Sequence, residues 1–132
     1  MRKWLFVATL AIAGCSSPTG AAIPDVVATL QFVESGEDDR LKLTMVNLGA
    51  VAVTVACESF TIEGLTIEGW ETAIEHPCDE PTSGYPLEVP PQGSHVVEFA
   101  APAAGPQYRG AVRFSVSGPD DQWIVYSLSL TW

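Results

Sequence analysis

The chain has 132 residues, and its six Lys and Arg against sixteen Asp and Glu give a formal net charge of −10 at pH 7. A chain of this length supports one hydrophobic core and not two. Because proteins are drawn to nucleic acids through Lys and Arg, this acidic balance argues against a nucleic-acid-binding role.

The first residues have the layout of an export signal. Two basic residues at positions 2 and 3 precede an apolar run over residues 4–13, as in secretory signal peptides. A permanent transmembrane helix needs about 20 apolar residues, so this run is too short to be one. The run ends in Ile12-Ala13-Gly14-Cys15, which resembles the lipobox of bacterial lipoproteins. The alternative is an ordinary secretory signal whose cysteine falls there by chance.

The lipobox resemblance implies three segments. Residues 1–14 form a signal peptide that is cut off after Gly14, and the Cys15 thiol carries a diacylglyceryl group that anchors the protein in a membrane. Residues 15–24 are the lipidated cysteine and a flexible tether rich in Ser, Pro, Gly and Ala, and residues 25–132 are the folded domain. Cleavage removes two basic residues and no acidic one, so the formal charge becomes −12. Ser16 stands where enteric bacteria place Asp to retain lipoproteins at the inner membrane, so the resemblance favours the outer membrane.

Strand patterns follow one another along the rest of the chain. Leu41, Leu43 and Met45 alternate with more polar residues, and this period of two is typical of a strand with one buried face. Comparable β-branched or alternating runs, separated by Gly, Pro, Asn and Asp, predict strands over residues 26–33, 40–47, 51–57, 60–63, 65–68, 94–99, 108–117 and 123–132. The stretch from Glu71 to Pro91 contains five prolines and has no clear pattern, so we expect a long loop there.

About seven or eight short strands with regular turns indicate an all-β chain folded as a single antiparallel β-sandwich. The segments Leu43–Gly49 and Leu87–Gly93 and the final hairpin resemble immunoglobulin-like domains of secreted bacterial proteins, including the family related to intracellular proteinase inhibitors. This resemblance spans about residues 25–132 and implies an immunoglobulin-like sandwich. It does not extend to the cysteine and tryptophan spacing of antibody domains.

Two cysteines remain once Cys15 is assigned to the anchor. In an exported domain, Cys57 and Cys78 are expected to form one disulfide. Closing a loop of about twenty residues stabilises a fold by roughly 3 kcal/mol in the chain-entropy model. Metal binding is the competing hypothesis, because His76 lies two residues before Cys78. Zinc sites use three or four ligands at recognisable spacing, and the chain has no paired Cys-x-x-Cys, so no metal is expected.

No motif for catalysis or for a cofactor is present in the sequence. Ser94 and His95 are neighbours in a predicted strand, where adjacent side chains point to opposite faces, so they are not a nucleophile and its base. We expect His95 to be exposed or on an edge strand. The acidic groups Glu37–Asp39 and Asp120–Asp121 lack the spacing of a calcium loop and are interpreted as polar turns. The sequence therefore predicts a protein that is not an enzyme and has no cofactor.

Aromatic residues are the remaining candidates for recognition. Trp70, Tyr85, Trp123 and Trp132 either form a binding surface or fill the core and strand ends, and Trp70, Tyr85 and Trp123 are taken as the candidate binding residues. The favoured hypothesis is a lipid-anchored, non-catalytic module that binds an envelope protein or supports an envelope assembly. The alternative is an inhibitor that presents residues 71–91 to a protease, because a disulfide-held, proline-rich loop is pre-organised.

Overall fold

The structure is a computed structural model that describes residues 25–132 except residues 35, 37, 77, 79–84, 104, 117, 119 and 120. The predicted signal peptide, Cys15 and the tether lie outside the described residues. No helix in the described part is long and apolar enough to cross a membrane.

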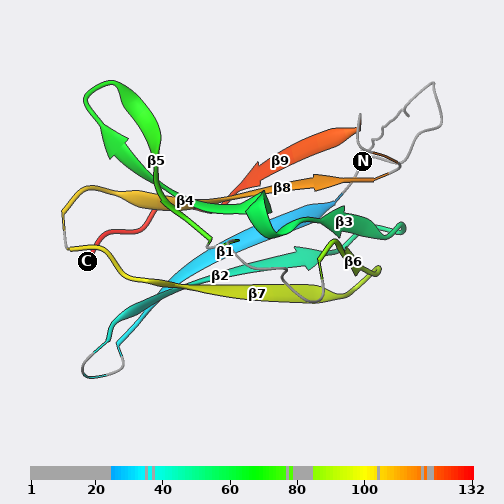
Figure 1. The fold of residues 1–132 in the computed structure, drawn as a ribbon, viewed down its shortest axis with the longest axis horizontal. Coiled ribbons are helices and arrows are strands. Elements are labelled where there is room, and N and C mark those ends of the chain that lie inside the picture. The colour runs from blue at the N-terminus through cyan, green and yellow to red at the C-terminus, as the bar shows by residue number, and fades with distance from the viewer. Residues whose placement is uncertain are drawn as a thin grey trace, which may run out of the picture.

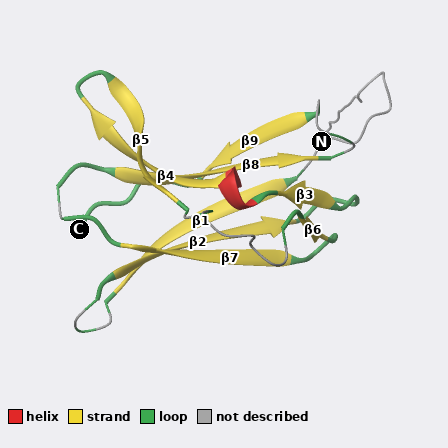
Figure 2. Ribbon diagram, in the orientation of Figure 1, coloured by secondary structure: helices red, strands yellow, loops and turns green. Residues whose placement is uncertain are grey.

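The described chain is all-β, as predicted, and forms two antiparallel sheets (Figures 1 and 2). The smaller sheet has the order β1-β2-β7, and the larger sheet contains the other six strands. The nine strands described are β1 (Val26–Val33), β2 (Arg40–Asn47), β3 (Val53–Val55), β4 (Phe60–Thr66), β5 (Gly69–Glu75), β6 (Leu87–Val89), β7 (Ser94–Ala100), β8 (Tyr108–Ser115) and β9 (Gln122–Tyr126). They exceed the expected seven or eight because β6 and most of β5 lie in the stretch interpreted as a loop, although the two strands predicted over residues 60–63 and 65–68 are replaced by the single strand β4.

The larger sheet is organised around β8. Val112 pairs with Val125 of β9 and with Phe60 of β4, while Ser115 pairs with β9 and with Thr54 of β3. Because a strand has only two edges, β3 and β4 lie end to end along the edge of β8 opposite β9. Seven residues from Thr54 to Phe60 span only four residues of β8, Val112 to Ser115, and the three surplus residues form the 3₁₀ turn Cys57–Ser59.

The core lies between the two sheets and is built from alternate residues of the strands. Leu41, Leu43 and Met45 of β2 are fully buried, which confirms the alternation predicted for that strand. Phe60 and Ile62 of β4 face them from the other sheet and are also fully buried. Apolar side chains from both sheets thus fill one continuous core, as a sandwich requires.

The structure corrects the two short strands predicted over residues 60–63 and 65–68. β4 continues through Gly64, and the chain reverses at Ile67 and Glu68, so residues 65–68 are not a separate strand. β5 follows and pairs with β4, with a register shift at Ile62/Glu63. Most of its residues are exposed, because the β4–β5 hairpin projects from the sandwich (Figure 1). A strand that buries neither face fully shows no alternation in its sequence.

Two further assignments change at the carboxyl end. β9 ends at Tyr126, and beyond it only Leu130 forms a bridge, with Tyr108. Trp132, considered for surface recognition, is half-buried, and its ring stacks on Phe32 and on Tyr108 with centroid distances of 4.9 Å in both cases. Trp132 therefore closes one end of the core.

Asn47 at the end of β2 fixes the corner between the sheets. Its side chain is buried, and Nδ2 donates to the carbonyl oxygens of Val51 at 2.8 Å and Val89 at 3.0 Å. Its Oδ1 accepts a hydrogen bond from the Gly49 amide at 3.0 Å. The buried side-chain amide of Asn47 thus connects the end of β2 to the residues next to β3 and in β6.

Candidate functional site

The predicted disulfide between Cys57 and Cys78 is present, with the two Cα atoms 6.0 Å apart. Cys57 belongs to the 3₁₀ turn and is buried, whereas Cys78 is exposed. The Ser59 side chain stabilises the turn, because its Oγ accepts a hydrogen bond from the Ala56 amide at 2.9 Å. The surplus residues between β3 and β4 therefore place one sulfur at the edge of the core, where the chain after β5 reaches it.

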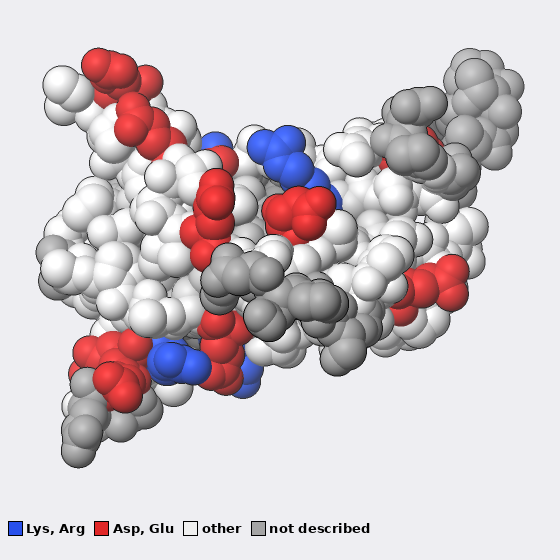
Figure 3. Space-filling view, in the orientation of Figure 1, with Lys and Arg blue, Asp and Glu red and all other residues white. Residues whose placement is uncertain are grey.

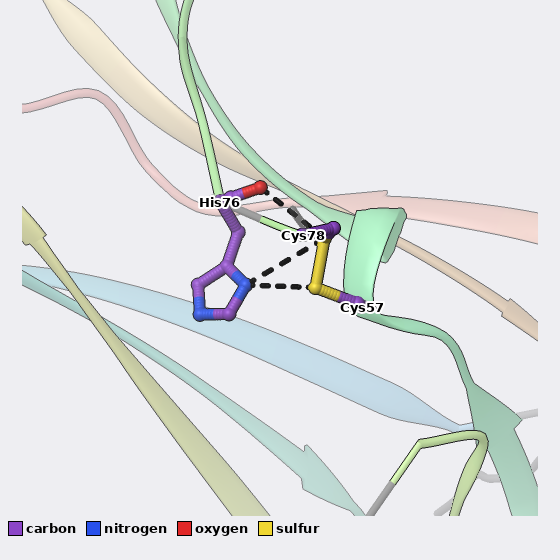
Figure 4. A group of neighbouring side chains, drawn as sticks. All are labelled: Cys57, His76 and Cys78. Carbon is purple, nitrogen blue, oxygen red and sulfur yellow. Dashed lines mark hydrogen bonds between the residues drawn. A yellow bond between two sulfur atoms is a disulfide. The ribbon is translucent and has the colours of Figure 1, made fainter. Parts of the chain in front are cut away.

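His76 directly follows β5, and its imidazole points at the disulfide (Figure 4). Nδ1 lies 3.1 Å from the Cys57 Sγ and 3.9 Å from the Cys78 Sγ. The ring also meets Phe99 of β7 edge-on, with a centroid distance of 6.0 Å. The half-buried imidazole is thus held between the smaller sheet and the disulfide.

The second histidine of the chain lies nearby on β7. The Nε2 atom of His95 is 2.8 Å from the Tyr85 hydroxyl, and its ring packs against Phe60. The expectation of an edge strand is confirmed, because β7 is an outer strand of its sheet. His95 is not exposed, however: it is half-buried and shares the inward face with Val97 and Phe99.

Burial sets the protonation of this pair. Desolvation, and secondarily the charge of nearby His76, lower the pKa of His95 below its ordinary value, while burial raises the pKa of Tyr85. Both shifts favour the neutral forms. When His95 is neutral and carries its proton on Nδ1, its Nε2 accepts a hydrogen bond from the Tyr85 hydroxyl. This hydrogen bond joins the β5–β6 connection to β7 without burying a charge.

A second group of side chains occupies the outer face of the larger sheet, the face turned away from the smaller sheet. The Arg109 guanidinium carbon lies 4.3 Å from the ring centre of Trp70 and 3.8 Å from that of Tyr126. Arg109 Nε also donates to Glu63 at 2.8 Å. We call these four residues the arginine clamp. Cation–π stacking and a charge-assisted hydrogen bond hold the guanidinium in one place.

Strand register explains why the clamp forms. Glu63 pairs with Arg109 across β4 and β8, and Tyr126 of β9 pairs with the next outward-facing residue of β8, Ala111. Trp70 of β5 lies opposite Leu65 of β4. Directly paired residues share a face of a sheet, so these side chains meet on the outer face, and the apolar side chains of Leu65 and Ile124 on the same face remain exposed.

The three predicted binding residues are not brought together. Trp70 belongs to the arginine clamp, while Tyr85 contacts His95 and His76. Trp123 pairs with the buried Phe114, which places it at the inward face of β9, and its indole donates to Asp121 at 3.0 Å. Three residues of the clamp were not predicted: Glu63, Arg109 and Tyr126. The alternation in the last predicted strand is a signal for Tyr126, but the sequence does not show the register that joins it to Arg109.

An open hollow of about 560 Å³ lies beside the end of β8. Its lining includes the polar side chains of Thr54, Ser59, Arg113, Ser115 and Gln122. One guanidinium and several hydroxyl groups could accept a small anionic group. The hollow is wide open, and it is a weaker candidate than the two side-chain clusters.

Acidic side chains lie at two projecting ends of the molecule as well as across its middle (Figure 3). Acidic side chains gather on the β4–β5 hairpin and near the β1–β2 turn in the view of Figure 3. Glu68 and Glu71 on this hairpin are exposed, and the same hairpin carries Trp70.

Comparison with known proteins gives no family. No protein-family model matches the chain, and no curated protein matches it. Among solved structures, the Northeast Structural Genomics Consortium target SoR45 is similar, with 13% identity, a TM-score of 0.45 and 84% of each chain covered. A penta-heme cytochrome c552 from Thermochromatium tepidum is similar with 12% identity and a TM-score of 0.44, over 79% of this chain and 38% of the cytochrome.

Proposed function

We propose that this chain is a lipid-anchored, non-catalytic envelope protein whose sandwich binds a protein partner through the arginine clamp and its apolar surroundings. The anchor is Cys15 of the lipobox, which attaches the domain to a membrane, and Ser16 favours the outer membrane. The tether over residues 15–24 gives the domain reach from that surface.

The arginine clamp is the observation that carries the binding role. Tyr126 and Leu65 expose 42% and 37% of their surface on one sheet face, beside a guanidinium fixed by two aromatic rings. Trp, Tyr and Arg are the residue types that dominate binding energy at protein interfaces. Because the clamp is already held by Glu63, its side chains lose little freedom on binding, which lowers the cost of association.

Charge indicates the kind of partner. The β4–β5 hairpin that carries Trp70 also carries exposed carboxylates, and the domain is strongly acidic overall. The complementary surface is apolar at its centre and carries Lys and Arg at its rim. We therefore expect binding to weaken as salt is added, because rim charges are screened by ions.

The test uses the purified mature protein to capture and identify a partner from its own envelope, followed by affinity measurements with the purified partner. Trp70→Ala and Tyr126→Ala are each expected to cost about 2 kcal/mol or more, roughly a thirtyfold rise in Kd. Trp123→Ala is the matched control, since it removes an aromatic ring outside the clamp that is as exposed as Tyr126. Equal losses in all three variants, or no loss in any, would refute the assignment.

We also infer that the sandwich is immunoglobulin-like. The chain passes between the sheets so that β7 returns beside β2, while β8 and β9 join β4 in the other sheet. This interleaved order supports Greek-key connections of the immunoglobulin type.

The inhibitor hypothesis has less support. Both ends of the stretch from residue 71 to residue 91 belong to strands, because β5 ends at Glu75 and β6 covers Leu87–Val89. The described connecting residues His76 and Tyr85 pack towards β7 rather than away from it. A protease inhibition assay tests the alternative directly.

A further inference from the structure

We propose that opening the Cys57–Cys78 disulfide converts it, together with His76, into a binding site for Cu⁺. The ligand atoms are the two Sγ atoms and the His76 Nδ1, all of which lie within 4.8 Å of one another. Each side chain comes from a different place: the 3₁₀ turn, the end of β5, and the chain just beyond it (Figure 4). The fold has therefore gathered a two-sulfur, one-nitrogen donor set around one point.

The His76 Nδ1 atom already lies about as far from the two sulfurs as two donor atoms bound to one metal ion lie from each other. Metal–sulfur and metal–nitrogen bonds of about 2.3 and 2.0 Å separate the donor atoms by about 3.5 Å around a tetrahedral ion and slightly more around a trigonal one. The observed distances from Nδ1 to the two sulfurs are 3.1 and 3.9 Å, one on each side of that value. Only the sulfurs need to separate, by about 2 Å beyond their bonded position.

Of the two cysteines, the exposed one is the one that would move. Cys78 is exposed and lies beyond the end of β5, whereas Cys57 is buried in a turn anchored by Ser59. Phe99 and Tyr85 support the other side of the imidazole. Such packing fixes a metal-binding ring in place.

The disulfide itself is a poor ligand, so the site depends on reduction by a thiol. A reductant thiolate attacks the exposed Sγ of Cys78, the sulfur–sulfur bond breaks, and its electron pair leaves on Cys57. A second thiol of the reductant resolves the mixed disulfide. The two electrons come from the reductant, which departs as a disulfide, and both cysteines become thiols. Cu⁺ then displaces the two thiol protons, and Nδ1 coordinates with its ring proton on Nε2.

Cu⁺ is the ion that this donor set suits best. Thiolate ligands select Cu⁺ and Zn²⁺ over harder cations. Three donors can complete a trigonal Cu⁺ site, whereas Zn²⁺ needs a fourth ligand from water or elsewhere. A medium reducing enough to open the disulfide also keeps copper in the +1 state.

The experiment titrates the purified mature protein with Cu⁺ under anaerobic conditions against a chromophoric Cu⁺ chelator. We expect one equivalent to bind to the reduced protein and none to the oxidised protein. His76→Ala, in the reduced state, is expected to bind at least about tenfold more weakly, since even changes outside the ligand shell cost that much. His95→Gln is the matched control, because it alters the other histidine and leaves the three ligands intact.

A second readout protects the test against unfolding of the reduced chain. Cu⁺ is expected to raise the Tm of the reduced protein, because binding to the folded state stabilises it, and not to raise that of reduced Cys78→Ser. Equal affinity in the reduced wild type and His76→Ala would overturn the site, as would equal binding before and after reduction. Tighter binding of Zn²⁺ than of Cu⁺ would refute the choice of ion.

Discussion

Reduction of the Cys57–Cys78 disulfide gives the sharpest test of how the molecule is held together. The bond closes a loop with a sequence separation of 21 residues. In the chain-entropy model, such a loop removes about 11 cal/mol/K from the unfolded chain, or about 3 kcal/mol at 25 °C. A domain of this size has a free energy of unfolding of roughly 5–15 kcal/mol. We therefore expect reduction to lower the free energy of unfolding by about 3 kcal/mol and to leave the protein folded.

Urea denaturation followed by tryptophan fluorescence measures this difference. The oxidised wild type, the reduced wild type and Cys78→Ser are compared at one pH, and the last two should unfold at similar urea concentrations. Cys78→Ser is the cleaner variant, because the exposed Cys78 tolerates a hydroxyl better than the buried Cys57 does. Adding reductant to Cys78→Ser should change nothing. A loss below about 1 kcal/mol would show that the β5–β6 connection is already restrained without the bond, and the entropic argument would then fail.

Three other substitutions probe the core and the histidine pair. Asn47→Ala removes three side-chain hydrogen bonds, two of them to backbone carbonyl groups, and is expected to cost about 2–4 kcal/mol in urea unfolding; a loss below 1 kcal/mol would contradict the corner role. Gly110→Ala places a Cβ against the buried Leu43, with Cγ only 3.2 Å away, and should cost about 1–3 kcal/mol, part of which Leu43→Val should restore. His95→Gln tests the lowered pKa of His95: as pH falls below the unfolded value of about 6.5, the unfolded chain takes up the proton first, so the wild type loses stability. The wild-type advantage over His95→Gln should therefore shrink from pH 7.5 to pH 5, and a constant difference would refute the shift.

The parts of the fold that were predictable from sequence are those in which one face of a strand is buried. β1 and β2 begin and end at the predicted residues, because their alternation reflects a core on one side and solvent on the other. β5 was not predictable for the opposite reason. It belongs to a projecting hairpin and is mostly exposed, so solvent contact left no period in its sequence.

The candidate site was predictable only in its covalent part. Counting cysteines after Cys15 was enough to pair Cys57 with Cys78. His76 lies beside both sulfurs because three extra residues between β3 and β4 form the turn that holds Cys57. No local sequence pattern predicts these extra residues. The arginine clamp likewise depends on the register of four strands, and register joins residues far apart in the chain.

The two proposed sites share one hairpin and can still be separated by experiment. Trp70 lies near the tip of the β4–β5 hairpin, on the outer face, while His76 follows the other end of β5 and points towards the smaller sheet. Reduction frees the chain beyond His76 but breaks none of the pairs between β4 and β5 or between β4 and β8. The clamp should therefore keep its geometry when the disulfide opens. Partner binding that survives reduction while Cu⁺ binding appears would establish two independent sites. Partner binding that the reduced wild type loses only when Cu⁺ is added, and that Cys78→Ser retains with Cu⁺, would point to the bound metal, and not to the missing bond, as the cause.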